Sequence, residues 1–439
     1  MPARPDIPSR RMRAAMTAPA IFLLACACAA ISLLLGAGVS DSVARAEGER
    51  KISSAAPHIS VGEQTFPVVE EPPLRPEPGW PIWLKDPASG IRTEKTSGIA
   101  FVGRDANARE CFFLVDETGF FHFCRIATNA SGSAEVRLEP VRLEPSLLEE
   151  LRAYRKWDFE ELAIEAGRVD AGVAAGARAG ERAPFDTAKG VPDSVDGFVC
   201  VEGEAGHEAG TLAAVRFVRD EIQAPAIQEG GDTAAQTPPV PGDQAGSWRI
   251  VSRGEPLAGR EFWSEYAQPG RGLKGAAASN GFLFLGLDNL GRRGDLPARG
   301  SLLFFYDRLA GRVAQVNSAS YGIYSVGGIA AVSDSVLIVL DRSRMCITVM
   351  KWDPARSDIT QAHRFPLDLY GPGGFRYGIP NLEGITVDDR GDIWMVCDPE
   401  FGHYRAMEPD LPEIIHVYLA AGIPMLYRFP GAPVWAAIE

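Results

Sequence analysis

The chain has few cysteines and histidines and lacks the motifs of several common enzyme classes. Its 439 residues include 7 Cys and 6 His, and no spacing among the cysteines matches a zinc site. It contains no G-x-S-x-G elbow, no H-E-x-x-H and no P-loop, so a serine α/β-hydrolase, a zincin and a P-loop enzyme are not indicated. It has no dense Lys/Arg cluster, and its net charge is −13. Nucleic acid and anionic membrane surfaces are therefore not expected partners.

The five cysteines beyond the N-terminal segment are odd in number and widely spread, so they do not indicate a disulfide scaffold. One pair stands out. A two-residue turn at Glu117–Thr118 would pair Asp116 with Gly119 and set Cys111 opposite Cys124, near disulfide reach. Two buried free thiols are the alternative, and the sequence favours neither.

The N-terminus has the pattern of an export signal. Arg10, Arg11 and Arg13 are basic, residues 14–39 are apolar and uncharged, and residues 44–46 form an A-x-A cleavage site. We expect residues 1–46 to be a cleaved signal peptide or a retained membrane anchor, with lipoprotein processing at Cys26 as a third alternative. Each of these places the body of the chain outside the cytoplasm, in the periplasm or secreted, and limits membrane contact to this segment.

Five stretches of the chain repeat one pattern: a small-residue or Gly-initiated apolar run, a short turn, a second apolar run and an acidic residue. They begin at Ser97, Phe159, Lys274, Gly327 and Leu382, and their acidic residues are Asp116, Glu202, Asp288, Asp341 and Asp398. Short β-branched and aromatic runs bounded by Gly, Asp and Asn predict strands, and four-stranded repeats describe a β-propeller. A β-sandwich with coincidental repeats is the alternative.

We therefore predict an all-β fold with a single β-propeller over residues 96–430. Five blades are visible, and a sixth is predicted from the chain ends, with residues 425–429 paired to N-terminal strands. Residues 47–95 form a Pro-rich extended lead-in, and 167–191 and 223–244 are insertions in surface loops. Further expected elements are one helix over 145–161 and strands over 302–306, 346–352 and 414–419. We expect a monomer.

Propeller geometry brings the acidic residues together. The first strand of a blade lines the channel and the second runs antiparallel to it, so the start of the first and the end of the second lie on one face. The positions that begin the first strands are Ser97, Glu160, Lys274, Gly327 and Glu383. Carboxylates at one channel mouth repel each other, and Ca²⁺, with about six to eight oxygen ligands, would relieve this repulsion. Glu160 and Glu383 are the expected ligands because they lie innermost. Turn chemistry of Asp residues is the alternative.

Short motifs carry a resemblance to a known family. Residues 381–385 (NLEGI), the weaker 158–163 (DFEELA) and the starts SGIA, GGIA and KGAA resemble the blade motif of the "esterase-like activity of phytase" family, a group of exported bacterial propellers. The resemblance covers about residues 95–430. The chain departs from the motif where Ser97, Lys274 and Gly327 replace Glu, and where Glu161 replaces Gly.

The resemblance implies calcium at the channel mouth and hydrolysis of phosphate or carboxylate esters. It makes Glu160 and Glu383 metal ligands, with Asp288, Asp341 and Asp398 as candidates for metal binding or water activation. Phytate itself is not the expected substrate, because the acidic chain offers no dense Lys/Arg cluster to receive its charge.

Two main functional hypotheses follow. In the first, the protein is a metal-dependent hydrolase: Ca²⁺ activates a water, Asp398 or Glu383 takes its proton, and His403 on the following loop contacts an anionic substrate. Arg342 and Arg344 either bind phosphate or form local salt bridges. In the second, an extracytoplasmic propeller binds a ligand or protein without catalysis. A lactonase is a weaker third alternative. Carboxylates each paired to Arg or backbone N–H would favour the binding protein.

Overall fold

The computed structural model describes residues 58–60, 67–129, 133–151, 158–165, 190–202, 211–220, 247–253, 262–263, 272–279, 281–287, 302–370, 381–398 and 413–439. The chain divides into two compact units, Met1–Ser54 and Ala55–Glu439, and all described residues belong to the second. The predicted signal or anchor, the insertion 223–244 and most of the insertion 167–191 lie outside the described residues. Within the described ranges, no helix is long and apolar enough to cross a membrane.

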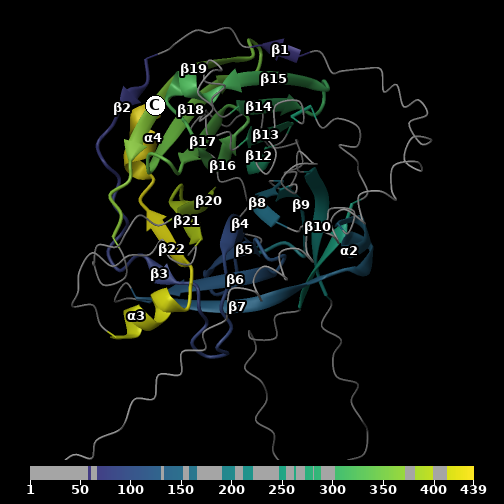
Figure 1. The fold of residues 1–439 in the computed structure, drawn as a ribbon, viewed down its shortest axis with the longest axis vertical. Helices are drawn as coiled ribbons and strands as arrows, with labels where there is room; N and C mark the ends of the chain where they lie inside the picture. Colours follow the sequence, from purple (N-terminus) through teal and green to yellow (C-terminus); the bar gives the residue numbers. More distant parts are fainter. Residues whose placement is uncertain are drawn as a thin grey trace, which may run out of the picture. The chain divides into compact units, whose positions relative to one another are not determined.

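The described strands form four sheets, here divided into blades 1 to 5, and consecutive strands within each blade pair antiparallel (Figure 1). Blades 1 and 2 belong to one eight-stranded sheet, because their outermost strands pair in parallel. Blade 1 contains β4 (Thr96–Arg104), β5 (Glu110–Asp116), β6 (Phe121–Thr128) and β7 (Ala134–Leu143). Blade 2 contains β8 (Asp158–Ile164), β9 (Ser194–Glu202), β10 (Thr211–Arg219) and β11 (Trp248–Ser252). Blade 3 contains β12 (Leu273–Ala278), β13 (Phe282–Leu287), β14 (Leu302–Asp307) and β15 (Arg312–Asn317). Blade 4 contains β16 (Val326–Ser333), β17 (Val336–Asp341), β18 (Cys346–Asp353) and β19 (Asp358–Pro366). Blade 5 contains β20 (Asn381–Val387), β21 (Ile393–Asp398), β22 (Met425–Phe429) and β3 (Ile82–Trp83).

The first strand of each of these blades lies at the centre of the fold. The inner strands β4, β8, β12, β16 and β20 contact one another in this order, and β20 contacts β4. Apolar side chains pack between neighbouring blades in five core clusters. In one cluster, the rings of Phe113 in blade 1 and Phe217 in blade 2 stack with centroids 3.9 Å apart. The arrangement is β-propeller-like, and the all-β prediction is confirmed.

The end of the chain completes a blade, but not the one that we predicted. As expected, residues 425–429 pair with an N-terminal strand, because β22 lies antiparallel to β3. This pairing supplies the fourth strand of blade 5. The cycle of inner strands is already closed by the contact between β20 and β4. The predicted sixth blade is therefore not present among the described strands.

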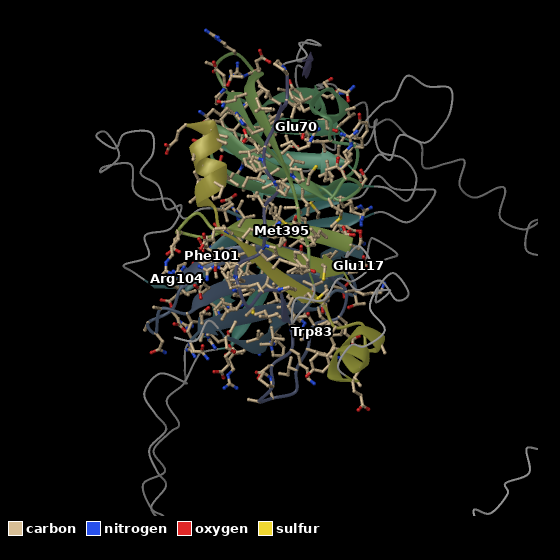
Figure 2. All side chains as sticks on the ribbon, turned by 90° about the vertical axis from the view of Figure 1, so that its left-hand side faces the viewer. Glu70, Trp83, Phe101, Arg104, Glu117 and Met395 are labelled. Atoms are coloured by element: carbon tan, nitrogen blue, oxygen red, sulfur yellow. The ribbon has the colours of Figure 1, made fainter. Side chains whose placement is uncertain are left out.

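The N-terminal lead-in lies along the outer edges of three blades. We call its described residues between 58 and 93 the N-terminal strap. Strand β1 (His58–Ser60) pairs in parallel with β15, and β2 (Val69–Glu70) pairs in parallel with β19. With β3 on β22, the strap contacts blades 3, 4 and 5 before the chain enters blade 1. Figure 2 shows Glu70 and Trp83 at separate points along it.

The helices differ from those expected. Helix α2 (Pro145–Leu151) begins at the predicted proline but ends before residue 158, where β8 starts. The strand predicted over 414–419 is wrong, because these residues lie in helix α3 (Glu413–Ala420). A short apolar run does not distinguish helix from strand, and here the edge-to-face contact of Tyr418 with Trp83, at 5.2 Å, packs the helix against the strap. Helix α4 (Ala432–Ile438) follows β22.

The β5–β6 hairpin is shifted by one residue from the predicted register. Gly119, with φ 88°, lies in its turn, and Cys111 faces Arg125 while Cys124 faces Phe112. Side chains alternate along a strand, so this shift turns the cysteines to opposite faces of blade 1. One packs toward blade 2 and the other toward blade 5. Both thiols are free and buried. Burial raises the pKa of Cys111 to about 12, which makes it a poor nucleophile.

Every inner strand has a register shift near its start. The skipped residues, here called the bulge ring, are Ser97, Glu160, Lys274, Gly327 and Glu383. The residues that follow them, here called the glycine ring, are Gly98, Glu161, Gly275, Gly328 and Gly384. A Cβ atom on Gly384 would lie 2.8 Å from Ser97 O and 3.0 Å from Gly98 Cα. The inner strands of blades 5 and 1 therefore approach too closely at Gly384 for a side chain.

A side chain at this ring should destabilise the fold. Gly384→Ala places a methyl group against the backbone of blade 1, and we expect a loss of about 1–3 kcal/mol in the free energy of unfolding. Urea denaturation measures it. Gly281→Ala is the matched control, because its Cβ atom would meet nothing closer than Leu309 Cδ1 at 3.6 Å. Equal stability of the two variants would contradict the close approach.

Candidate functional site

The channel mouth is the end of the propeller where the inner strands begin. Strand pairing sets Thr96 opposite Asp116, Val326 opposite Asp341 and Asn381 opposite Asp398. These pairings place the three acidic positions beside the starts of inner strands. Of the other predicted site residues, Asp288 and His403 lie outside the described residues, and Asp398 is described only as the last residue of β21. In Figure 2, Glu117 at this end and Arg104 at the other end of β4 lie on opposite sides.

Glu160 forms an ion pair with a lysine of the neighbouring blade. Its Oε1 atom contacts Lys274 Nζ, and the side chains are only 1% and 9% exposed. In the same ring, Ser97 Oγ donates a hydrogen bond of 2.5 Å to Phe159 O. The bulge ring therefore links blade 1 to blade 2 and blade 2 to blade 3 through polar side chains.

Glu383 is held by Arg342, for which we predicted either phosphate binding or a local salt bridge. Its Oε1 atom accepts hydrogen bonds of 2.5 Å from both Arg342 Nη1 and Asn381 Nδ2. Arg342 Nε donates to Ser325 Oγ at 3.1 Å, which orients the guanidinium. Burial raises the pKa of Glu383, while the charges of Lys274 and Arg342 oppose this shift. Arg342 ties blade 4 to blade 5.

Asp341 and Asp116 stabilise local structure. Asp341 Oδ1 accepts from Ser343 N at 2.9 Å and Ser343 Oγ at 2.7 Å, and Oδ2 accepts from Tyr324 N at 2.8 Å. Asp116 accepts from Thr96 Oγ1 and Glu94 N, each at 3.1 Å. Asp341 thus shows the turn chemistry that was the alternative to metal binding, whereas Asp116 holds the start of the neighbouring strand β4.

The described side chains do not fit the predicted calcium site. Calcium takes about six to eight oxygen ligands, whereas Glu160 and Glu383 are engaged by Lys274 and Arg342. Within the described ranges, no group of three or more His, Cys, Asp or Glu residues is arranged to hold a metal ion. Cations of the chain itself thus relieve the repulsion from which we predicted calcium.

Glu161 is the one member of the glycine ring with a side chain, and sequence reasoning noted it only as a departure from the motif. It is fully buried. Its Oε1 atom accepts from Leu162 N at 3.1 Å, and its Oε2 atom lies 2.7 Å from the place where a Cβ atom on Gly328 would be. The carboxyl group of blade 2 therefore reaches the inner strand of blade 4. Burial raises the pKa of Glu161 well above its usual value, although the N–H groups of Leu162 and Ile99 oppose the shift.

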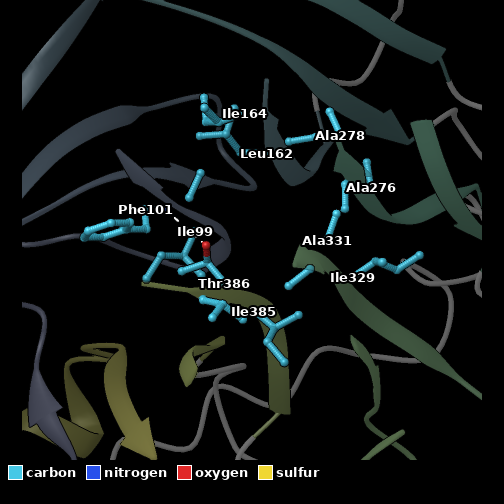
Figure 3. Close-up of a pocket in the computed structure, with 15 residues that line it drawn as sticks. Ile99, Phe101, Leu162, Ile164, Ala276, Ala278, Ile329, Ala331, Ile385 and Thr386 are labelled. Carbon is cyan, nitrogen blue, oxygen red and sulfur yellow. Dashed lines mark hydrogen bonds between the residues drawn. The ribbon is translucent and has the colours of Figure 1, made fainter. Parts of the chain in front are cut away.

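A narrow apolar cavity continues the channel beyond the glycine ring (Figure 3). Three successive residues of each inner strand line it, beginning at Ile99, Leu162, Ala276, Ile329 and Ile385. Thr386 Oγ1 is engaged within the lining, where it accepts from Phe101 N at 3.1 Å. The cavity volume of about 50 Å³ has room for a few waters and not for a drug-sized ligand. Ligand contacts are therefore expected at the mouth.

Comparisons with known proteins assign no family. No family model matches the chain, and no curated protein matches it. A solved structure of a luciferin-regenerating enzyme aligns at TM-score 0.34 and 12% identity, covering 80% of this chain and 96% of that one. An auxiliary nutrient binding protein from Bacteroides thetaiotaomicron aligns at TM-score 0.30 and 10% identity, covering 71% and 54%. Likenesses this distant carry no argument about function, and the resemblance to the esterase-like family stays a prediction.

The buried carboxyl of Glu161 predicts a specific pH dependence. Its raised pKa means that the folded state keeps a proton that the unfolded state releases above about pH 4.5. Its contribution to stability therefore falls as pH rises, until the folded-state pKa is reached. The neutral Glu161→Gln removes this slope, so its stability relative to the parent should increase by up to about 1.4 kcal/mol per pH unit above that point.

Urea denaturation between about pH 4 and pH 9 measures this difference. Glu139→Gln, on the outer strand β7 and paired with Arg125, controls for the loss of a carboxylate elsewhere. Parallel pH profiles for Glu161→Gln and the parent would show that Glu161 is not protonated in the folded state.

Proposed function

We propose that the protein is an exported, non-catalytic β-propeller that binds a small anionic ligand at its channel mouth. Export rests on the basic and apolar pattern of residues 1–46. The observation that supports binding over catalysis is the pairing at the mouth. Each described carboxylate there that we proposed as a metal ligand, Glu160, Glu383 and Asp341, is held by a cation or hydrogen-bond donor of the chain.

This pairing argues against the hydrolase hypothesis. A Lewis-acid mechanism needs carboxylate oxygens that are available to the metal and an open coordination position. Here the ammonium group of Lys274 pairs with Glu160, and the guanidinium group of Arg342 pairs with Glu383. Both carboxylates are therefore engaged by cations of the chain. Glu383, our predicted proton acceptor, is fixed by two donors at 2.5 Å. These contacts suit a rigid mouth whose shape is fixed before a ligand binds.

The rim of the mouth offers groups for an anionic ligand. Arg344 is exposed, and its guanidinium lies over the ring of Tyr324, 4.1 Å from the centroid. Such stacking fixes the plane of an arginine, which can then bind a carboxylate or phosphate with two hydrogen bonds. Tyr324 is 42% exposed. For Arg344 we gave a local salt bridge as the alternative to phosphate binding. No salt bridge of Arg344 is found among the described residues.

Binding of simple anions tests the proposal. Thermal melting with inorganic phosphate and with succinate should show a dose-dependent rise for the parent. Arg344→Gln should weaken the effect about tenfold, the loss expected for one charge-assisted hydrogen bond. Arg356→Gln is the matched control: it changes an exposed arginine at the opposite end of blade 4, paired with Asp353, and should leave binding unchanged.

Calcium tests the alternative hydrolase hypothesis. Millimolar Ca²⁺ should leave the melting temperature where EDTA leaves it, and hydrolysis of p-nitrophenyl phosphate and p-nitrophenyl acetate should not depend on Ca²⁺. A Ca²⁺-dependent rise together with ester hydrolysis lost in Glu383→Gln would overturn the binding proposal in favour of the hydrolase.

A further inference from the structure

Two buried carboxylate oxygens at the inner end of the mouth have no hydrogen-bond donor in the described part of the chain. They are Oε2 of Glu161 and Oε2 of Glu383, on residues that are 0% and 1% exposed. Buried acceptors in folded proteins are almost always satisfied, since an unmade hydrogen bond carries the full cost of desolvation. The two oxygens therefore point to a donor that the described residues do not supply.

The position of these oxygens is set by the glycine ring. A Cβ atom on Gly328 would lie 2.7 Å from Glu161 Oε2 and 2.8 Å from the carbonyl oxygen of Glu383. A carboxylate oxygen of blade 2 and a backbone oxygen of blade 5 thus converge on the same glycine of blade 4. The absence of a side chain at Gly328 is what leaves Glu161 its place there.

The charges at this end are unequal. Three buried carboxyl groups, Glu160, Glu161 and Glu383, lie near two buried or half-buried cations, Lys274 and Arg342. Asp116 and Asp341 are two further buried carboxyl groups at the mouth. Among these described groups, carboxylates therefore outnumber cations when all are ionised.

We propose that the Glu161 carboxyl, with Oε2 of Glu383, binds one ammonium group, either the free ion or a short primary amine. An ammonium group carries a positive charge and several N–H donors, which matches both the excess of carboxylates and the unsatisfied acceptors. The cavity of about 50 Å³ beyond it accepts a methyl-sized substituent and excludes long chains. The inference goes beyond the proposed function, since it adds a cation site at the inner part of the same mouth.

Thermal melting of the full-length chain tests the ammonium site. At about pH 8, ammonium chloride and methylammonium chloride should raise the melting temperature with increasing dose. Potassium chloride and tetramethylammonium chloride, cations without N–H donors, should not do so at equal ionic strength. Isothermal titration with methylammonium measures the affinity directly.

Two variants decide the assignment. Glu161→Gln should abolish the ammonium effect, because the amide removes the charge and supplies its own N–H donors. Glu139→Gln, on the outer strand β7, should retain it. A second inner variant, Glu383→Gln, should weaken ammonium binding severalfold. It provides an independent test if Glu161→Gln folds poorly.

Several results would overturn the inference. If potassium raised the melting temperature as much as ammonium, the site would not depend on N–H donors. If the ammonium effect were unchanged in Glu161→Gln, ammonium would bind elsewhere. No ammonium effect in the parent, with phosphate or succinate binding intact, would overturn this inference and leave the proposed function standing. If phosphate and succinate had no effect on the parent while ammonium still raised its melting temperature, the proposed function would be overturned and this inference would stand.

Discussion

The close approach of the five inner strands is the constraint on which the rest of the structure depends. At the glycine ring, backbone atoms of neighbouring blades lie so near that a Cβ atom would come within 3.0 Å of them, as at Gly98 and Gly384. The register shift just before the ring places one extra residue per blade at the mouth. The same shift repeated in all five blades makes the bulge ring, and the bulge ring carries the charged side chains. Geometry and charge at the mouth thus have one origin.

The charges at the mouth join neighbouring blades. A buried ion pair gains little net stability, because desolvation offsets much of the attraction, but breaking one partner away is costly. The pairs Glu160–Lys274 and Arg342–Glu383 each join two different blades. They therefore favour one order and one register of neighbouring blades over others. A metal ion in the same position would make that order depend on ion supply, and the chain's own lysine and arginine avoid this dependence.

The sequence predicted the elements that repeat and missed those that depend on contacts between distant segments. The apolar runs from Ser97 to Leu382 identified every inner strand, and alternation sufficed because each is short and bounded by turns. The sixth blade and the helix α3 were misjudged, since both depend on where the strap residues Ile82 and Trp83 pack.

The site was predicted in the same uneven way. Propeller geometry placed Glu160 and Glu383 at the mouth correctly, but their partners lie on other blades, and no local spacing indicates such pairs. Lys274 and Glu161 were visible only as exceptions to the motif. Both turn out to be central to the charge balance, so departures from a repeat were the most informative signal for the site.

The N-terminal strap has a consequence for the order in which the fold forms. Strand β3 belongs to the first part of the chain to be synthesised, and its partner β22 to the last. Until β22 arrives, the strap has no edge on blade 5 to join, and blade 5 has an open outer edge. Contacts between such distant segments slow folding, and an open strand edge is a template for pairing with another chain. The closing blade is therefore the step at which nascent molecules are most exposed to one another, and export in an unfolded form would postpone that step to the destination compartment.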